Sequence, residues 1–382
     1  MNPKKQALEY HQGGKLEIKS KVKLENKEDL SLAYTPGVAY PCQEIAKDKK
    51  NSYNYTSRSN MIAIISDGSA VLGLGNIGPE AAMPVMEGKA LLFKKFGKID
   101  AIPLCINTQN TNEIIRTIKN LEPSFGGINL EDISAPRCFE IEEKLKREMN
   151  IPVFHDDQHG TAIVVLAGLI NAIKLTNRNK DTKIIINGAG AAGIAITKLL
   201  LNYKFTNITV CDSKGIISKE RENLNKYKEE ISKLTNKTNQ TGLLENALVN
   251  ADIFIGVSKG NILTKEMIQK MNPNPIIFAM ANPTPEIDPT LAKEAGAKII
   301  ATGRSDFPNQ INNVLAFPGL FRGVLDAKTK EITTQMKMKT AETLAQIAEE
   351  DLSYDKIIPD PFNPEVPKKI AQAIHELVNS KP

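Results

Sequence analysis

Four carboxylates gather in two short segments of the chain. Glu131 and Asp132 are adjacent, and Asp156 and Asp157 follow after an intervening helical stretch. Adjacent acids repel one another unless water or a cation neutralises them. Hard divalent cations such as Mg²⁺ or Mn²⁺ favour a few carboxylates, with room left for water and substrate oxygens. The two segments therefore indicate a divalent metal site, with helix capping and solvated charge as the alternatives.

Two histidines, His155 and His159, lie beside the second acidic pair. A zinc site would need a fuller ligand set, such as the H-E-x-x-H arrangement or a nearby cysteine, and the sequence offers neither there. We therefore interpret both histidines as structural residues.

The pattern G-x-G-x-x-G occurs twice, at residues 73–78 and 188–193. A dinucleotide site needs an apolar strand that runs into the first glycine, a helix after it, and a carboxylate at the end of the next strand. The second copy has all three, because Asp212 closes the apolar run 208–211. We expect the cofactor to bind at Gly188, Gly190, Ala191, Ala192, Gly193 and Asp212.

The first glycine copy lacks this context. Its strand is interrupted by Asp67 and Gly68, and the acid at the matching distance, Asp100, begins a strand instead of ending one. We therefore expect residues 73–78 to form a tight loop, or a loop close to the substrate.

The elements around these residues predict an α/β fold with two domains. From residue 183 onward, short β-rich runs alternate with helices, which is typical of a doubly wound parallel sheet. With 382 residues and roughly 100–200 residues per domain, we expect an N-terminal α/β catalytic domain at 1–155 and a Rossmann-like dinucleotide-binding domain at 156–382. The second domain includes the helical patterns at 334–350 and 366–378. A helix expected at 161–175, with the polar segment before it, would connect the two.

The composition narrows the class of protein. The hydrophobic fraction is 41%, the charged fraction is 24% and the net charge is +5, but no basic block is interleaved with aromatic residues, so we expect no nucleic-acid partner. The apolar runs fall well short of the roughly 20 residues of a membrane span. The N-terminus shows no secretory pattern and the four cysteines lie far apart. We expect a soluble, cytoplasmic homodimer without a membrane partner.

Several segments together resemble the malic enzyme family, in the compact form of its smaller bacterial members. The resemblance extends over nearly the full chain, and unrelated dinucleotide enzymes do not share these segments in this order. The segments are 33–38, 87–93, 129–132, 154–162, 281–286, 312–314 and 317–319.

The resemblance implies a role for each matching residue. Tyr34 is then the general acid and Lys89 the general base; Glu131, Asp132 and Asp157 are the metal ligands; Asn282 and Asn313 contact the substrate, with Asn282 also near the cofactor; and Asp156 orients the site. The residues alone leave other roles open, since Tyr34 could be a turn aromatic and Lys89 a partly buried surface lysine. One departure concerns Asp67-Gly68-Ser69-Ala70, which lacks the arginine that larger relatives carry just after their Asp-Gly pair.

The reaction implied is the oxidative decarboxylation of (S)-malate to pyruvate and CO₂ with NAD(P) and Mg²⁺ or Mn²⁺, together with decarboxylation of oxaloacetate. The pKa of Lys89 has to fall from about 10.4 if its amine is to accept a proton. We expect NAD to be preferred because Asp212 would repel the 2′-phosphate of NADP, although Lys214 could neutralise that phosphate. The rivals are a metal-independent NAD-dependent hydroxy- or amino-acid dehydrogenase and a non-catalytic dinucleotide-binding redox sensor. The acidic cluster argues against both.

Overall fold

Two mainly parallel sheets organise the computed structural model, which describes residues 2–71 and 73–380. The smaller sheet has four parallel strands in the order β2-β1-β3-β4. Their cores are continuous apolar runs, as expected of parallel strands buried on both faces. The strands and the helices that connect them are β1 (Met61–Ser66), α5 (Pro79–Gly97), β2 (Asp100–Cys105), α6 (Thr111–Leu121), β3 (Gly127–Leu130), α7 (Arg137–Glu148) and β4 (Val153–His155).

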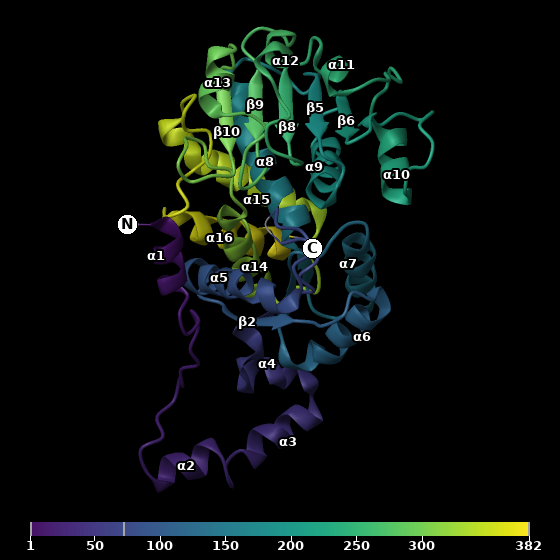
Figure 1. The fold of residues 1–382 in the computed structure, drawn as a ribbon. Coiled ribbons are helices and arrows are strands. Elements are labelled where there is room, and N and C mark those ends of the chain that lie inside the picture. The colour runs from purple at the N-terminus through teal and green to yellow at the C-terminus, as the bar shows by residue number, and fades with distance from the viewer. Residues whose placement is uncertain (1, 72, 381–382) are drawn as a thin grey trace.

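The larger sheet has six strands in the order β10-β9-β8-β5-β6-β7 and lies in the upper half of Figure 1. All neighbours are parallel except the short β6–β7 hairpin. The chain starts at β5, turns to β6 and then returns to β8 on the other side of β5, which creates a topological switch point at the carboxyl ends of β5 and β8. The predicted doubly wound sheet is confirmed. Its strands are β5 (Ile184–Asn187), β6 (Ile208–Asp212), β7 (Gly215–Ile216), β8 (Ile253–Gly256), β9 (Ile276–Ala279) and β10 (Ile299–Thr302), and its helices are α9 (Ala191–Asn202), α10 (Lys226–Leu234), α11 (Leu244–Leu248), α12 (Lys265–Gln269) and α13 (Pro289–Glu294).

The helix α8 (Asp156–Leu175) connects the two sheets. It begins five residues earlier than the sequence predicted, because the acids of its first turn are favoured at the positive end of the helix dipole. Among the described residues it is the one helix long and apolar enough to cross a membrane. However, 72% of the apolar window is buried inside the fold, so α8 is a core helix.

The C-terminal helices contact both halves of the molecule. α14 (Phe317–Asp326) packs on α5, where the ring of Phe93 lies 4.5 Å from that of Phe317 and 5.3 Å from that of Phe321. α15 (Thr334–Ile347) packs on α8, and α16 (Glu365–Asn379) lies against α14 and α15. The two sheets are therefore joined by more than the single helix α8.

The N-terminal segment departs from this core. α1 (Pro3–Tyr10) lies near α5, whereas α2 (Lys27–Ala33) and α3 (Ala39–Lys47) project away from the smaller sheet, at the bottom of Figure 1. We call residues 16–48 the arm. The chain rejoins the core through α4 (Ser52–Tyr55), and short 3₁₀ turns occur at Lys49–Asn51, Ser57–Asn60, Glu122–Ser124, Asn313–Leu315 and Ala348–Asp351.

Candidate active site

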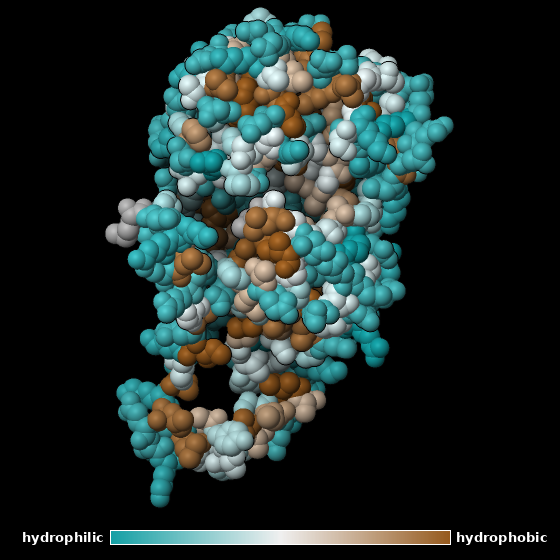
Figure 2. Space-filling model, viewed as in Figure 1, coloured by the Kyte–Doolittle hydropathy of each residue, from teal (hydrophilic) through white to brown (hydrophobic). Residues whose placement is uncertain are grey.

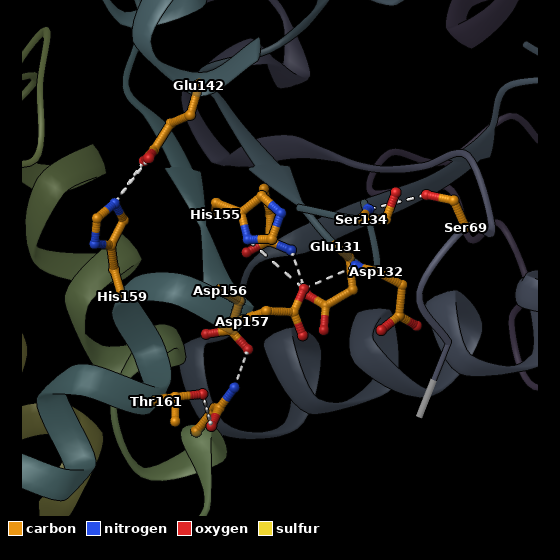
Figure 3. A network of polar contacts seen from close by, with 12 residues as sticks. Ser69, Glu131, Asp132, Ser134, Glu142, His155, Asp156, Asp157, His159 and Thr161 are labelled. Carbon is orange, nitrogen blue, oxygen red and sulfur yellow. Dashed lines mark hydrogen bonds and ion pairs between the residues drawn. The ribbon is translucent and has the colours of Figure 1, made fainter. Parts of the chain in front are cut away.

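Three carboxylates converge at the carboxyl edge of the smaller sheet. Glu131 and Asp132 follow β3, and Asp157 lies in the first turn of α8, just after the neighbouring strand β4. One ligand oxygen from each lies within 4.8 Å of the others. The backbone N–H of Asp132, a residue with φ of 53°, donates to Asp157 Oδ2 at 2.8 Å. Figure 3 shows these side chains turned toward one another. The structure thus brings together the three acids of the predicted metal site.

Lys89 reaches this cluster from α5. Its Nζ lies 2.9 Å from Glu131 Oε1 and 2.5 Å from Asp156 Oδ2, and 4.3 Å from the centre of the Phe317 ring. Burial alone would lower the pKa of Lys89, but Asp156 and Glu131 outweigh it and hold the pKa above its usual value. The expected fall in the pKa of Lys89, which counted on burial and a nearby metal cation, is opposed here by the ion pairs with Asp156 and Glu131.

Asp156 lies between Lys89 and the substrate-side amide of Asn313. Its Oδ2 also accepts from Asn313 Nδ2 at 2.8 Å, and Asn313 Oδ1 accepts from the hydroxyl of Thr161 at 3.2 Å. A Cβ at Gly160 would lie 1.9 Å from Asp156 Oδ1, so only glycine leaves room for this carboxylate. Asp156 is placed to orient both the lysine and the asparagine.

The two histidines take different directions. His159 turns to the far side of α8, where its Nε2 lies 2.8 Å from a carboxylate oxygen of Glu142, as Figure 3 shows. Burial lowers the pKa of His159 to about 4, against the opposing effect of Glu142. His155 Nδ1 is 3.6 Å from Asp157 Oδ2. Within the described residues no histidine belongs to the metal-type cluster.

A cavity of about 750 Å³ opens between the two sheets, over the carboxylates. The smaller-sheet side contributes Lys89, Glu131, Asp132 and Asp157, and the larger-sheet side contributes residues that include Ala192, Ser258, Asn282 and Asn313. Both predicted substrate-binding asparagines therefore lie at the cavity, beside the predicted base and metal ligands.

A second cavity of about 390 Å³ lies over the glycine turn after β5 and shares Val257 and Ser258 with the first. The glycines are required there, since a Cβ at Gly188 would lie 2.6 Å from Val257 O and one at Gly193 would lie 1.7 Å from Gly188 O. α9 begins at Ala191, so its first N–H groups face the place of a pyrophosphate. Asp212, at the end of the neighbouring strand β6, also lines this second cavity.

Asp212 is more heavily neutralised than the sequence indicated. Its Oδ1 lies 2.6 Å from Arg221 Nη2, and its Oδ2 lies 2.6 Å from Lys228 Nζ. Burial opposes ionisation, but these two cations and the backbone N–H of Lys214 keep the pKa of Asp212 below its usual value. Lys228 lines the second cavity and Lys214 does not. Lys228 is thus a cation at this cavity in addition to the nearby Lys214, whose backbone N–H contacts Asp212 and whose side chain is exposed.

The first glycine copy forms a loop at the main cavity. Gly73, Gly75 and Gly78 have φ of 77°, 78° and 85°. Gly73 lines the cavity, where a Cβ would lie 2.4 Å from Asn282 O. Two interpretations were given for residues 73–78. A loop that lines the cavity agrees with the second, a loop close to the substrate.

One predicted catalytic residue lies apart. Tyr34 caps the end of α2 on the arm, is 67% exposed and does not line the cavity. Conversely, Tyr10, His11 and Lys15 line the cavity without having been predicted. Lys15 is fixed there by its backbone N–H on Glu87 Oε2, at 3.0 Å, and by its Nζ on Pro84 O, at 2.7 Å. These contacts join residues about 70 positions apart, so no local sequence pattern announces them.

Two family models, several known proteins and solved structures match this chain. Residues 158–378 match the family "Malic enzyme, NAD binding domain", and residues 13–116 and 108–146 match "Malic enzyme, N-terminal domain". The "Bifunctional malic/malolactic enzyme" of Bacillus subtilis is 56% identical over 98% of this chain and 92% of its own length. The "NAD-dependent malic enzyme" of Geobacillus stearothermophilus is 54% identical over 96% of this chain and 77% of its own length. The crystal structure of the NAD-dependent malic enzyme of Thermotoga maritima matches with a TM-score of 0.94 and 51% identity, over 97% of this chain and 98% of the other.

Proposed function

The chain belongs to the malic enzyme family, and we propose that it works through a divalent metal ion held by Glu131, Asp132 and Asp157. Its reaction is the oxidative decarboxylation of (S)-malate to pyruvate and CO₂ with reduction of NAD or NADP. The observation that supports the metal best is the convergence of three carboxylates on the wall of the cavity that also holds Lys89.

The donor set suits Mg²⁺ or Mn²⁺. All three ligands are oxygens, which these hard cations prefer, and the cavity beside them leaves room for water and substrate oxygens. Burial raises the pKa of Glu131 well above its usual value; Lys89 opposes this, and the neighbouring Asp157 adds to it. A divalent cation would favour the ionised form of Glu131, because its charge offsets the repulsion among the neighbouring carboxylates. When bound, the ion supplies Lewis acidity for the C2 oxygen of the substrate.

Two different side chains carry out the two proton transfers of the reaction, Lys89 as the base and Tyr34 as the acid. A divalent cation on Glu131 would offset one of the two carboxylates that hold the pKa of Lys89 high, so that the amine could take the proton of the C2 hydroxyl as the C2 hydride passes to the nicotinamide. Asp156 would then hold the resulting ammonium group. The amides of Asn282 and Asn313 bind the substrate and fix its orientation. After CO₂ leaves, Tyr34 protonates C3 of the enol of pyruvate. The same residues also decarboxylate oxaloacetate, because that reaction begins after hydride transfer.

Lys15 supplies positive charge at the cavity in the absence of the arginine of larger relatives. Ala70 stands at the cavity where that arginine is missing, and Lys15 and Lys89 are the ammonium groups among the described residues that line it. Because Lys89 is held by two carboxylates, Lys15 is the better placed to attract a substrate carboxylate.

NAD is the preferred cofactor, and NADP is used less well. Asp212 ends β6 beside the glycine turn, where a carboxylate accepts hydrogen bonds from ribose hydroxyls. Arg221 and Lys228 offset its charge, so the preference is modest. The enzyme acts as a cytoplasmic homodimer, and its catalytic and dinucleotide-binding domains meet at residues 155 and 156.

The assay follows reduced cofactor and pyruvate after malate is added, first with EDTA and then with Mn²⁺ restored. Asp157→Ala should abolish metal-dependent turnover and leave binding of reduced cofactor unchanged, because Asp157 lies outside the glycine turn. Asp355→Ala, an exposed aspartate away from the site, is the matched control. Malate oxidation that persists in EDTA, or at full rate in Asp157→Ala, would favour the metal-independent dehydrogenase. Since the relative from Bacillus subtilis is named a malic/malolactic enzyme, lactate should be measured as well.

A further inference from the structure

A third cavity, of about 240 Å³, lies on the far side of α8 from the carboxylate cluster, where Figure 3 shows His159. α7 of the smaller-sheet half forms one wall, and α9, α10 and α15 form others, with Gln158 and His159 of α8 between them. The residues that line it do not include any that line the catalytic cavity. It is therefore a separate space, although both cavities adjoin the first turn of α8.

One lysine in this cavity lacks an ion partner. Lys337 lines it from α15 and is only 6% exposed, and within the described residues it makes no hydrogen bond and no direct ion pair. The other charged side chains of the cavity each have a partner. The pairs are Glu142 with Lys146 at 3.8 Å, Glu143 with Lys226 at 3.9 Å and Lys198 with Glu230 at 2.7 Å. A buried cation without a partner is costly, so this cavity suits an anion that would neutralise Lys337.

A second hydrogen-bond donor at the cavity is also unused. Gln158 is 4% exposed, and its Nε2 has no hydrogen-bond partner in the described part of the chain. Buried polar groups in folded proteins nearly always have one. Gln158 and Lys337 line the cavity from α8 and α15, which pack on each other. An amide N–H and an ammonium group are donors that a carboxylate accepts. Burial lowers the pKa of Lys337 to about 7, and a bound carboxylate would favour its charged form.

The rest of the cavity favours a ligand with a short apolar part. Its lining includes the apolar side chains of Phe139, Ile194 and Leu199. An engineered apolar cavity of about 150 Å³ admits benzene, so there is room here for a small organic acid. Figure 2 shows mostly hydrophilic surface over α7 and α10, at the right of the view, which suits the approach of a charged molecule. A monocarboxylate fits better than phosphate, because a second charge would be buried without a partner.

The cavity adjoins the turn that positions the proposed metal ligands. Gln158 directly follows Asp157, so the first turn of α8 presents one residue to each cavity. A ligand held between α7, α8 and α9 contacts both halves of the molecule. It therefore favours the arrangement of the halves seen here, in which the carboxylates of the cluster converge.

We propose that this cavity is an effector site for a small organic acid, whose carboxylate binds Lys337 and Gln158 and whose apolar part lies between α7 and α9, and that its occupation strengthens cation binding at the carboxylate cluster. The effect on the cation rests on the proposed metal site, whereas the binding of the organic acid does not. By linkage, the cation strengthens binding of the organic acid by the same factor.

Butyrate, a short monocarboxylate, is the probe. Its binding to the full chain is followed by saturation-transfer NMR at pH 7, with Mg²⁺ and excess malate but no NAD or NADP, so that the catalytic cavity is occupied without turnover. Butyrate should bind with a Kd on the order of 1 mM, which is ordinary for a ligand of this size. Displacement of butyrate by malate would place it in the catalytic cavity and refute the separate site. Stronger competition by inorganic phosphate would overturn the class of ligand.

Variants at the cavity test the assigned contacts. Lys337→Met should abolish butyrate binding, and Lys337→Arg should retain it. Thr334→Glu adds a negative charge at an exposed lining position in the first turn of α15, where an acid is tolerated, and should also weaken butyrate. Lys198→Met is the matched control, since this lysine lines the same cavity but is partly exposed and paired with Glu230, and should bind as the parent does. Parental binding in Lys337→Met, or equal loss in Lys198→Met, would refute the assignment to Lys337.

Calorimetric titration of Mn²⁺ tests the effector role without turnover. Saturating butyrate should lower the Kd of Mn²⁺ by about fivefold or more, the lower end of usual coupling, in the parent and in Lys198→Met but not in Lys337→Met. Butyrate that binds at Lys337 and leaves the Kd of Mn²⁺ unchanged would refute the effector role. Absence of Mn²⁺ binding in the parent would instead refute the proposed metal site, and the effector role with it, while the NMR result would still decide whether the cavity binds an organic acid.

Discussion

Two clusters of buried charge lie on opposite sides of the first turn of α8, and they differ in how their charges are balanced. On one side, Lys89 contacts Glu131 and Asp156, and Asp157 lines the large cavity together with Lys89 and Glu131. On the other side, His159 joins the acid Glu142 around a cavity of about 240 Å³, which Lys337 of α15 also lines. Both sides contain a buried lysine, but the pKa values of the two lysines move in opposite directions.

The partners of each lysine explain this difference. Burial lowers the pKa of Lys337 to about 7; Lys146 adds to the effect and Glu142 only partly opposes it. Burial acts on Lys89 in the same sense, but Asp156 and Glu131 reverse the outcome. Burial therefore decides the direction of the pKa shift of a buried lysine only where no carboxylate contacts its ammonium group directly. The excess of acids around Lys89 favours binding of a metal cation and a catalytic role. The charges around Glu142 nearly cancel, which favours a structural role for that cluster.

The same substitution at the two lysines should separate catalysis from structure most sharply. Lys89→Met removes the proposed base and should lower kcat by a factor on the order of 10²–10⁴. Lys337→Met should change kcat by less than about threefold, since one positioned catalytic group is worth far more than that. Steady-state kinetics with malate and saturating Mn²⁺ compares them. Equal losses would mean that the cluster around Glu142 takes part in the reaction.

Lys337→Met, the variant with the smaller expected effect on kcat, should have a pH-dependent effect on the free energy of unfolding. With a pKa of about 7 when folded against 10.5 as the ordinary value, Lys337 binds a proton more readily in the unfolded chain. The folded state therefore loses stability as the pH falls from 10.5 toward 7, and the loss levels off below 7. The gain in unfolding free energy from Lys337→Met should be about 2–3 kcal/mol larger at pH 6 than at pH 9. Urea unfolding at both pH values measures it, and a gain that does not depend on pH would contradict the assigned cause.

Asp156 and Glu142 offer the corresponding comparison among the acids. Asp156→Asn keeps the shape but weakens the hold on Lys89 and on the amide of Asn313, so kcat should fall by about 10–100-fold, as is usual when an orienting partner is lost. The effect should appear in kcat more than in binding of reduced cofactor. Glu142→Gln is the matched control and should leave kcat near that of the parent. If the two variants behave alike, Asp156 is only a structural acid.

The sequence predicted best those elements whose buried faces are continuous. The strand expected before Asp67 and Gly68 is β1, Met61–Ser66, since parallel strands covered on both sides appear as apolar runs. The second glycine pattern was assigned from its strand, its helix and Asp212, all of which are local in sequence. The two acidic segments were expected to form one metal site, and the structure shows that they follow the neighbouring strands β3 and β4.

What the sequence could not predict depends on distant contacts. Lys89 meets Asp156 across 67 positions, and this ion pair reverses the expected direction of its pKa. The polar start of α8 was missed because apolar periodicity carries no information about a turn composed of His159 and its polar neighbours. The position of Tyr34 was beyond reach for another reason, since the arm has no buried face in its own chain from which a position could be inferred.

Asp212 extends the comparison to the cofactor, where the expected effect is the smallest. Like Lys89, it is a charged group held by two opposite charges, here Arg221 and Lys228. The carboxylate accepts from ribose hydroxyls and repels a 2′-phosphate, while Lys228 at the cavity attracts that phosphate. The parent should therefore favour NAD by a modest factor. Removal of Asp212 should leave both cations uncompensated, and removal of Lys228 should leave the carboxylate less neutralised.

Asp212→Ala should consequently weaken NAD by about 1 kcal/mol, the worth of a shared hydrogen bond, and leave NADP equal or improved. Lys228→Ala should move the ratio of kcat/KM values the other way, toward NAD, because the phosphate loses its cation. Lys214→Ala is the matched control, since only the backbone N–H of Lys214 contacts Asp212, at 2.9 Å. The measurement is kcat/KM for both cofactors in the parent and the three variants. A parent that favours NADP, or an Asp212→Ala ratio that does not move toward NADP, would show that Asp212 serves to hold Arg221 and Lys228 and does not read the ribose.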